Sequence, residues 1–154
     1  MDLLSHSLWS YVLWHNDAQV AAAVAAGVLP DLIGVLPPAI AAGAKHRSLR
    51  AAFYCTNPPR WAARYKALMY PLTHSLVVSA LAWVFVSLAF GAQWWLLAWP
   101  LHVFIDILSH PSNNTAPFLY PFSERRMHGV RWWDKRFVAV NAVLLLIVFL
   151  ALTH

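Results

Sequence analysis

The sequence predicts an all-α protein, a polytopic membrane bundle of four or five hydrophobic helices forming one domain over residues 1–154. Hydrophobic residues make up 60% of the chain and charged residues only 11%, whereas soluble domains average about 25% charged residues. Long apolar runs alternate with short polar stretches, a pattern typical of membrane-spanning helices. Nine Trp, five Tyr and eight Phe supply aromatic residues of the kind that gather at lipid–water boundaries.

The first two apolar segments differ in length and composition. Residues 3–14 predict a short amphipathic helix, well below the roughly 20 residues needed to cross a bilayer. Residues 18–40 predict a long Ala/Val-rich helix, whose small side chains permit close approach by neighbouring helices. Pro30 and the Pro-Pro pair at 37–38 should kink or end that helix close to Asp31. We therefore expect a distorted helix that carries a buried acid.

The rest of the chain divides into two basic connections and three further apolar spans. The spans are 73–90, 94–110 and 137–153. The first connection, 43–70, contains a break at Asn57-Pro58-Pro59, and we expect two short surface helices, one on either side of it. The second connection is the loop 111–136. We expect the last span, 137–153, to form a C-terminal membrane helix.

The basic residues lie between the apolar spans. The net charge of +5 would suit nucleic acid, but this placement favours anionic membrane lipid as the partner. Under the positive-inside rule, both basic connections face the cytoplasm. The sequence thus predicts a multi-pass membrane protein whose basic connections face the cytoplasm, with no nucleic-acid partner.

Three polar residues recur every fourth position within an apolar run. His102, Asp106 and His110 would stack along one stripe of a helix, because residues at i and i+4 share a face. An aspartate at a bilayer centre costs roughly 2.5–3.5 kcal/mol on insertion scales. A bound cation is the simplest compensation, although a hydrogen-bonded polar seam between helices would also explain the stripe.

The predicted topology brings further polar residues to the same depth. Asp31 lies in the inner half of its helix, His74 opens the second span, and His6 lies near the start of a helix anchored on the inner side. The single Cys55 excludes a Cys-paired metal site, which leaves imidazole and carboxylate ligands. These suit Zn²⁺ or Mn²⁺, and they suffice for one or two ions. The candidate metal ligands are His6, Asp31, His74, His102, Asp106 and His110.

Each candidate also has a structural interpretation. Asp31 could satisfy backbone groups freed by Pro30 or pair with an arginine, and His6 on a short helix could be structural. His110 precedes Pro111 and could face water. A second set of polar residues is expected to contact the substrate: Ser75, Asn113, Arg125 and Arg126. Loop polarity and contact with the membrane surface would explain the last three equally well.

The order and spacing of these residues resemble a known family. His6, Leu29-Pro30-Asp31, Thr73-His74-Ser75 and His102-x3-Asp106 resemble small bacterial inner-membrane proteins described as metal-dependent hydrolases, some of them LexA-regulated. The match spans roughly residues 1–122. The resemblance implies a metal-dependent hydrolase held in the inner membrane.

A more distant similarity connects the same residues to the zinc-dependent phospholipase C and P1-nuclease group, which cleaves phosphoesters. That resemblance implies Asp31 as a bridging carboxylate, with His74, His102 and Asp106 as terminal ligands. The chain departs from the group in having Met1 in place of a ligating Trp, and in lacking a second His-x3-acidic element. One or two ions are therefore expected, not three.

The leading hypothesis is an integral membrane hydrolase that uses metal-activated water on an ester or phosphoester of a lipid or lipid-linked substrate. Asp31 or Asp106 would accept the proton. One alternative is a haem-binding bundle using two of His6, His74 and His102, although nearby carboxylates speak against it. Another is a membrane adaptor or ion-handling protein without hydrolase activity.

Overall fold

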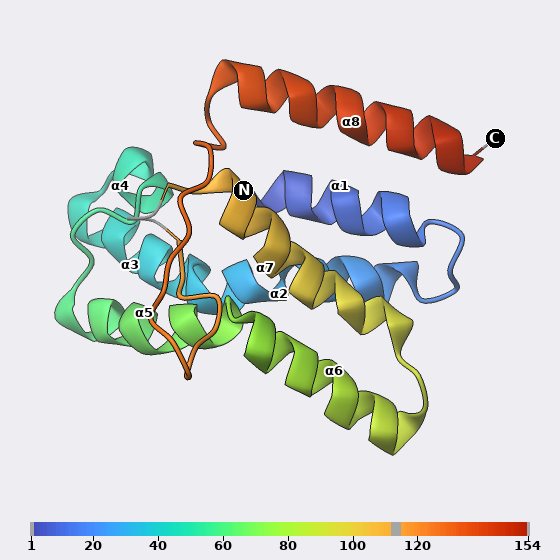
Figure 1. Ribbon diagram of the computed structural model, residues 1–154. Helices are drawn as coiled ribbons and strands as arrows, with labels where there is room; N and C mark the ends of the chain where they lie inside the picture. Colours follow the sequence, from blue (N-terminus) through green and yellow to red (C-terminus); the bar gives the residue numbers. More distant parts are fainter. Residues whose placement is uncertain (1, 112–114, 154) are drawn as a thin grey trace.

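A computed structural model describes residues 2–111 and 115–153, and this part of the chain contains helices and no strand (Figure 1). The all-α prediction is therefore confirmed. The elements are α1 (Leu3–Trp14), α2 (Val20–Gly34), α3 (Leu36–His46), α4 (Leu49–Phe53), α5 (Arg60–Thr73), α6 (Leu76–Phe90), the 3-10 helix η1 (Trp94–Leu97), α7 (Ala98–Ser109) and α8 (Lys135–Thr153).

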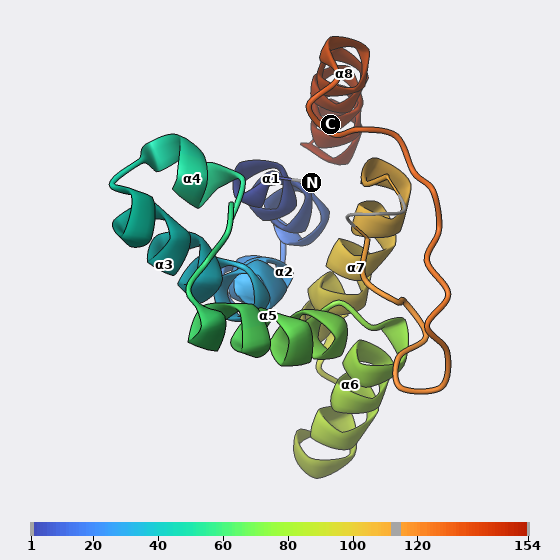
Figure 2. The ribbon, with the colours of Figure 1, turned by 90° about the vertical axis from the view of Figure 1, so that its left-hand side faces the viewer.

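Helix α2 lies at the centre of the fold. It packs against α1, α5, α7 and η1, and the end-on view shows α1 and α5 on different sides of it (Figure 2). Its buried Ala23 and Ala26 meet Leu96 and Ala98, and tryptophan side chains surround this cluster. Small side chains at the contact allow the backbones to approach closely, as packing between membrane helices requires.

Gly27 decides how closely α1 approaches α2. A Cβ atom at this position would overlap the side chain of Ser10 in α1. Ser10 is buried and donates its hydroxyl to the carbonyl of His6 at 2.9 Å. The glycine therefore lets α1 lie against α2 near His6, and α2 also packs on α7.

Two long segments bend at prolines. The segment predicted as one helix over 18–40 is two helices, α2 and α3, inclined by 46°. Pro30 lies inside α2, and α3 starts with its two prolines in the first turn, where a missing N–H costs little. Helix α5, expected to be short, has 14 residues and meets α6 at 62°. Both breaks lie beside the polar residues described below.

The described helices offer fewer membrane crossings than expected. Only α8 is long and apolar enough to cross a bilayer alone; up to three crossings result if each bent pair, α2–α3 and α5–α6, forms one span. Four or five spans were expected, but α1 and α7 have only 12 residues each. Helix α8 has no buried residue, so its apolar side chains are available to lipid.

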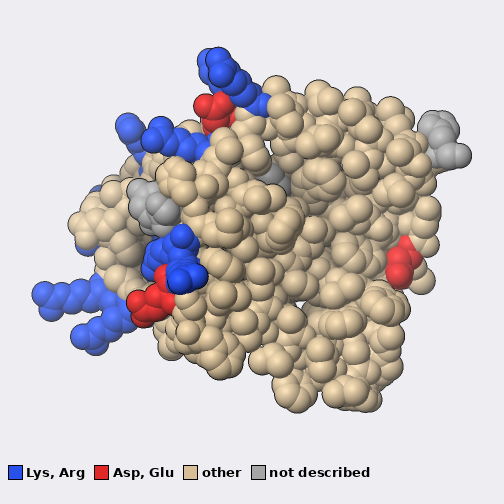
Figure 3. All heavy atoms as spheres, in the orientation of Figure 1, with Lys and Arg blue, Asp and Glu red and all other residues tan. Residues whose placement is uncertain are grey.

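Charge is concentrated at one end of the molecule. Figure 3 shows Lys and Arg side chains gathered on the side where Figure 1 places α3, α4 and α5. The loop that precedes α8 runs over the same end and is tied to the last turn of α7, with the amides of Gly129 and Val130 donating to the carbonyls of His110 and Leu108. Helix α7 therefore ends, and α8 begins, at the basic end.

Candidate metal centre

Four segments place the predicted polar residues together at this basic end. His6 comes from α1, Asp31 from α2, and His74 from the junction of α5 and α6, where it ends α5. His102 and Asp106 lie one turn apart in α7, and His110 follows its last residue. The convergence expected from the topology is thus present, although fewer helices span a bilayer than that topology assumed.

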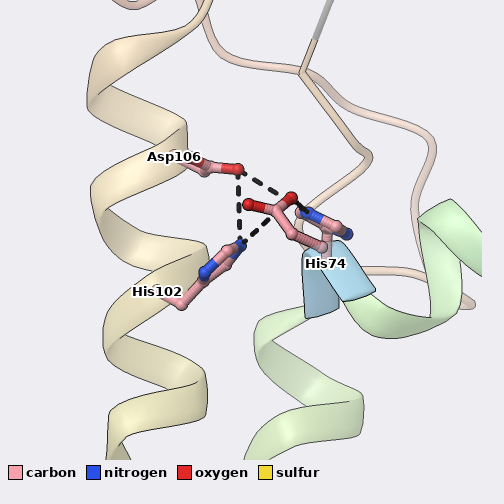
Figure 4. A group of neighbouring side chains, drawn as sticks. His74, His102 and Asp106 are labelled. Carbon is pink, nitrogen blue, oxygen red and sulfur yellow. Dashed lines mark hydrogen bonds and ion pairs between the residues drawn. The ribbon is translucent and has the colours of Figure 1, made fainter. Parts of the chain in front are cut away.

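Asp31, His74, His102 and Asp106 form a group that could hold a metal ion, with one ligand atom from each within 4.8 Å of all the others. His74 Nε2 lies 3.4 Å from Asp31 Oδ1 and 3.7 Å from Asp106 Oδ2. His102 Nε2 lies 4.0 Å from Asp31 Oδ1 and 3.6 Å from Asp106 Oδ2. Figure 4 shows His102 and Asp106 reaching from one helix toward His74.

These distances suit a tetrahedral zinc ion. Zinc binds imidazole nitrogen and carboxylate oxygen at roughly 2.0–2.2 Å, which separates neighbouring ligand atoms by about 3.4 Å in a tetrahedron. The four nitrogen–oxygen distances, 3.4 to 4.0 Å, are close to that value. The four side chains could therefore surround a single ion.

Backbone carbonyls fix the orientation of both imidazoles. His102 Nδ1 lies 2.7 Å from the carbonyl oxygen of Gly27, and His74 Nδ1 lies 3.2 Å from that of Tyr70. A carbonyl only accepts, so each Nδ1 carries the proton, and in a neutral ring Nε2 is left with a lone pair. Metal-binding histidines have this arrangement. His102 Nε2 is buried and makes no hydrogen bond within the described residues.

Without a cation, this arrangement is unfavourable. The Nε2 lone pairs of His74 and His102 face carboxylate oxygens, which also carry lone pairs. The two carboxylates together bear a charge of −2, and the group is mostly buried: His102 is 1% exposed and Asp106 7%. Buried charge requires pairing or a metal. A dication would neutralise both acids and engage both imidazoles.

His6 and His110 contact the other oxygen of Asp106. His6 Nε2 lies 2.9 Å and His110 Nδ1 lies 3.3 Å from Oδ1, while Oδ2 faces His74 and His102. The His6 ring also stacks on His102, with 3.7 Å between the ring centroids. These two histidines therefore orient Asp106, and they lie outside the four-residue group.

A small cavity adjoins the group. Its volume is about 10 Å³, and its lining residues are His74, Val103, Asp106, Ile107, Thr115 and Ala116. That volume is about the minimum for one ordered water molecule. Asp106 and His74 supply polar partners, and the apolar side chains close the remaining walls. The arrangement can therefore place a single water next to the ligand atoms.

The residues that were expected to contact the substrate differ in their burial and in their distance from the four-residue group. Ser75 is fully buried: its hydroxyl accepts from the amide of Val78 as the N-cap of α6 and donates to the carbonyl of Tyr120. Arg126 is exposed and donates to the carbonyl of Thr115, which lines the small cavity. Arg125 is also exposed. Asn113 lies outside the described residues. Ser75 thus holds the loop to α6, and Arg126 lies near the opening of the site.

Sequence reasoning missed the groups that orient the ligands. Gly27 and Tyr70 act through their backbone carbonyls, and because every residue has a backbone carbonyl, the residue type does not indicate this role. Thr73 adds a side-chain hydrogen bond to His74 Nδ1 at 2.9 Å, a role that its place in the Thr73-His74-Ser75 stretch did not predict. Its position directly before His74 was the available signal.

Comparisons with protein-family models, with curated proteins and with solved structures gave no match for this chain. Its function is therefore inferred from the geometry of the site alone.

Proposed function

We propose that this chain is a membrane-bound, metal-dependent hydrolase whose ion is held by Asp31, His74, His102 and Asp106. One observation supports this most strongly: two buried imidazoles, each fixed through Nδ1, direct Nε2 toward two carboxylates. A packing seam between helices would be expected to pair donors with acceptors. This group instead collects acceptors, which is the requirement of a cation.

Zinc is the proposed metal, with manganese as the alternative. Two imidazoles and two carboxylates are ligands that both ions accept, and the near-tetrahedral distances favour zinc. One ion occupies the four-residue group. A two-ion centre is the alternative stoichiometry, with the second ion between His6, His110 and Asp106 Oδ1.

The proposed chemistry is hydrolysis. A zinc ion would supply Lewis acidity and lower the pKa of a coordinated water toward about 7. The water-sized cavity places such a molecule beside Asp106 and His74. A carboxylate of Asp106 or Asp31 within hydrogen-bonding reach would accept its proton. The apolar walls made by Val103 and Ile107 limit access of further water.

The proposed substrate is an ester or phosphoester of a lipid or lipid-linked molecule at the cytoplasmic face of the bacterial inner membrane. Two observations support a lipid substrate: the site lies at the basic end of the fold, and large apolar side chains are exposed across its helices, such as Phe85 and Leu88 on α6. The Arg126 guanidinium near the site would attract a phosphate, because Arg binds phosphate oxygens strongly.

A haem protein is the less favoured alternative. A haem held by two histidines must fit between their rings, but His6 and His102 are stacked at 3.7 Å and the adjacent cavity has only about 10 Å³. A non-enzymatic metal-binding membrane protein or adaptor shares the same ligand set, and only activity separates it from a hydrolase.

The test measures metal and activity on the same purified protein in detergent. We expect about one zinc per chain and hydrolysis of bis(p-nitrophenyl) phosphate or p-nitrophenyl esters. A chelator should abolish hydrolysis and added zinc should restore it, whereas Asp106→Ala should lose both metal and activity. Bound metal without hydrolysis of phosphoester, ester or phospholipid would favour the adaptor. A chain that binds no metal would overturn the proposal.

A further inference from the structure

A second, separate feature lies at the basic end, at the turn between α3 and α4. An open cavity of about 540 Å³ is lined by His46, Ser48, Arg50, Ala51, Tyr54 and Thr56. Ligand pockets commonly measure roughly 300–1,000 Å³, so the cavity can accept a group much larger than water. The proposed hydrolase site does not include these residues.

The surroundings of this cavity are strongly basic. The sequence from residue 32 to residue 105 contains six Lys and Arg residues and no Asp or Glu. These residues belong to the end of the molecule where Figure 3 shows the blue side chains gathered. Figure 3 also shows acidic side chains beside them, but Lys and Arg outnumber Asp and Glu at this end. An excess of positive charge attracts an anion, and the attraction is strongest where the surface is concave.

The donors at the cavity differ in whether they contact another group of the chain. Lys45 Nζ and His46 Nε2 both lie within hydrogen-bonding distance of the carbonyl of Asn57. Within the part of the chain that the structure describes, the Arg50 guanidinium and the Tyr54 hydroxyl make no hydrogen bond. The Arg50 guanidinium and the Tyr54 hydroxyl are therefore available to donate to the oxygens of a phosphate.

Exposed apolar side chains adjoin these donors. Leu49 is 90% exposed and Phe53 is 65% exposed, and the two lie one turn apart on the same face of α4. Basic and large apolar residues side by side are typical of helices that rest in the headgroup region of a bilayer. A soluble anion would leave these two side chains in water.

The depth of α4 relative to α8 supports the same interpretation. The ring of Phe53 contacts that of Trp132, with 6.0 Å between centroids, and Trp132 contacts Trp133. These tryptophans immediately precede α8, the helix able to cross a bilayer alone. Tryptophan pairs at the start of a span mark the lipid–water interface. Helix α4 and its cavity thus lie at headgroup level.

We infer that the α3–α4 cavity binds the headgroup of an anionic phospholipid, with Arg50 and Tyr54 on the phosphate and with Leu49 and Phe53 among the acyl chains. The bound lipid is a structural or anchoring ligand, and the inference is independent of the metal site.

The test titrates the full chain in a neutral detergent with dioleoyl phosphatidylglycerol and counts retained lipid by native mass spectrometry. Removing an arginine that contacts the lipid phosphate directly should cost about five-fold in affinity. We expect that loss for Arg50→Gln and a smaller loss for Tyr54→Phe. The matched control is Arg64→Gln, an exposed arginine on α5 outside the cavity, which should bind within two-fold of the parent.

Two further ligands separate the possible sources of the phosphate. Dioleoyl phosphatidylcholine should bind more weakly than phosphatidylglycerol, and inorganic phosphate should not compete at millimolar concentration. Equal losses in Arg50→Gln and Arg64→Gln, equal binding of both lipids, or displacement by phosphate alone would each overturn the inference. Helix content by circular dichroism confirms that each variant is folded.

Discussion

His6 Nε2 lies 2.9 Å from Oδ1 of Asp106, although the two residues are 100 positions apart in the chain. This contact joins α1 to α7, the helix that carries two residues of the candidate metal centre. It occupies one oxygen of Asp106 and leaves the other facing His74 and His102. The first helix thus contributes to the site by orienting a ligand.

Replacing His6 with Gln should test that role. With Asp106 less firmly held, we expect zinc affinity to fall by about 10–100-fold, as for other groups that orient metal ligands. The number of ions per chain at saturating zinc should remain one. A competition titration with a chromophoric chelator measures the affinity, and a fall from two ions to one would instead support the two-ion centre.

Replacing His102 with Gln removes a direct ligand whose Nε2 has no other hydrogen-bond partner. Zinc measured by elemental analysis after dialysis should drop from about one ion per chain to less than 0.1. The control is His128→Gln in the exposed loop before α8, which should keep its zinc. Equal metal content in both variants would contradict the assignment.

Gly27→Ala should destabilise the protein, because the added Cβ would overlap Ser10. Overpacking a tight contact costs about 1–3 kcal/mol. The substitution should also weaken zinc binding, since the Gly27 carbonyl orients His102. Unfolding in detergent measures the first effect. Adding Ser10→Ala removes the hydroxyl that the methyl group would meet, so the double variant should recover part of the loss.

Asn141→Leu should loosen α8 from α1. Asn141 accepts a hydrogen bond from Trp9 Nε1 at 2.9 Å and donates to Ser5 Oγ at 3.4 Å. Hydrogen bonds between membrane helices contribute about 0.6–2 kcal/mol, and the loss should fall in that range. The control Ala142→Leu, which adds the same side chain at an exposed position without removing a bond, should leave the unfolding free energy nearly unchanged.

The single cysteine reports the proposed orientation. Cys55 is half-buried and follows α4 at the basic end, which the positive-inside rule assigns to the cytoplasm. A membrane-impermeant maleimide should label it in inside-out vesicles and spare it in intact spheroplasts. A Cys55→Ser variant provides the background, and labelling of intact spheroplasts would reverse the orientation.

Much of the helical pattern was predictable because apolar runs and prolines act locally. The ends of α1 and α8 were placed within two residues by the limits of their apolar runs. The break near Asp31 followed from its flanking prolines. The 46° angle at that break and the length of α5 were not predictable, because the angle at a proline depends on what each half packs against.

The sequence alone determined which residue types were available for a site: acids and imidazoles within apolar segments, where their burial requires compensation. Only the tertiary structure decided their roles, because ligation depends on which atom points where. It placed His74 and His102 with Nε2 facing the two carboxylates and Nδ1 near backbone carbonyls, and it placed His6 and His110 against the opposite oxygen of Asp106. Those roles depend on backbone carbonyls and on contacts between helices that are distant in the chain, and the spacing of residues in the sequence does not predict either.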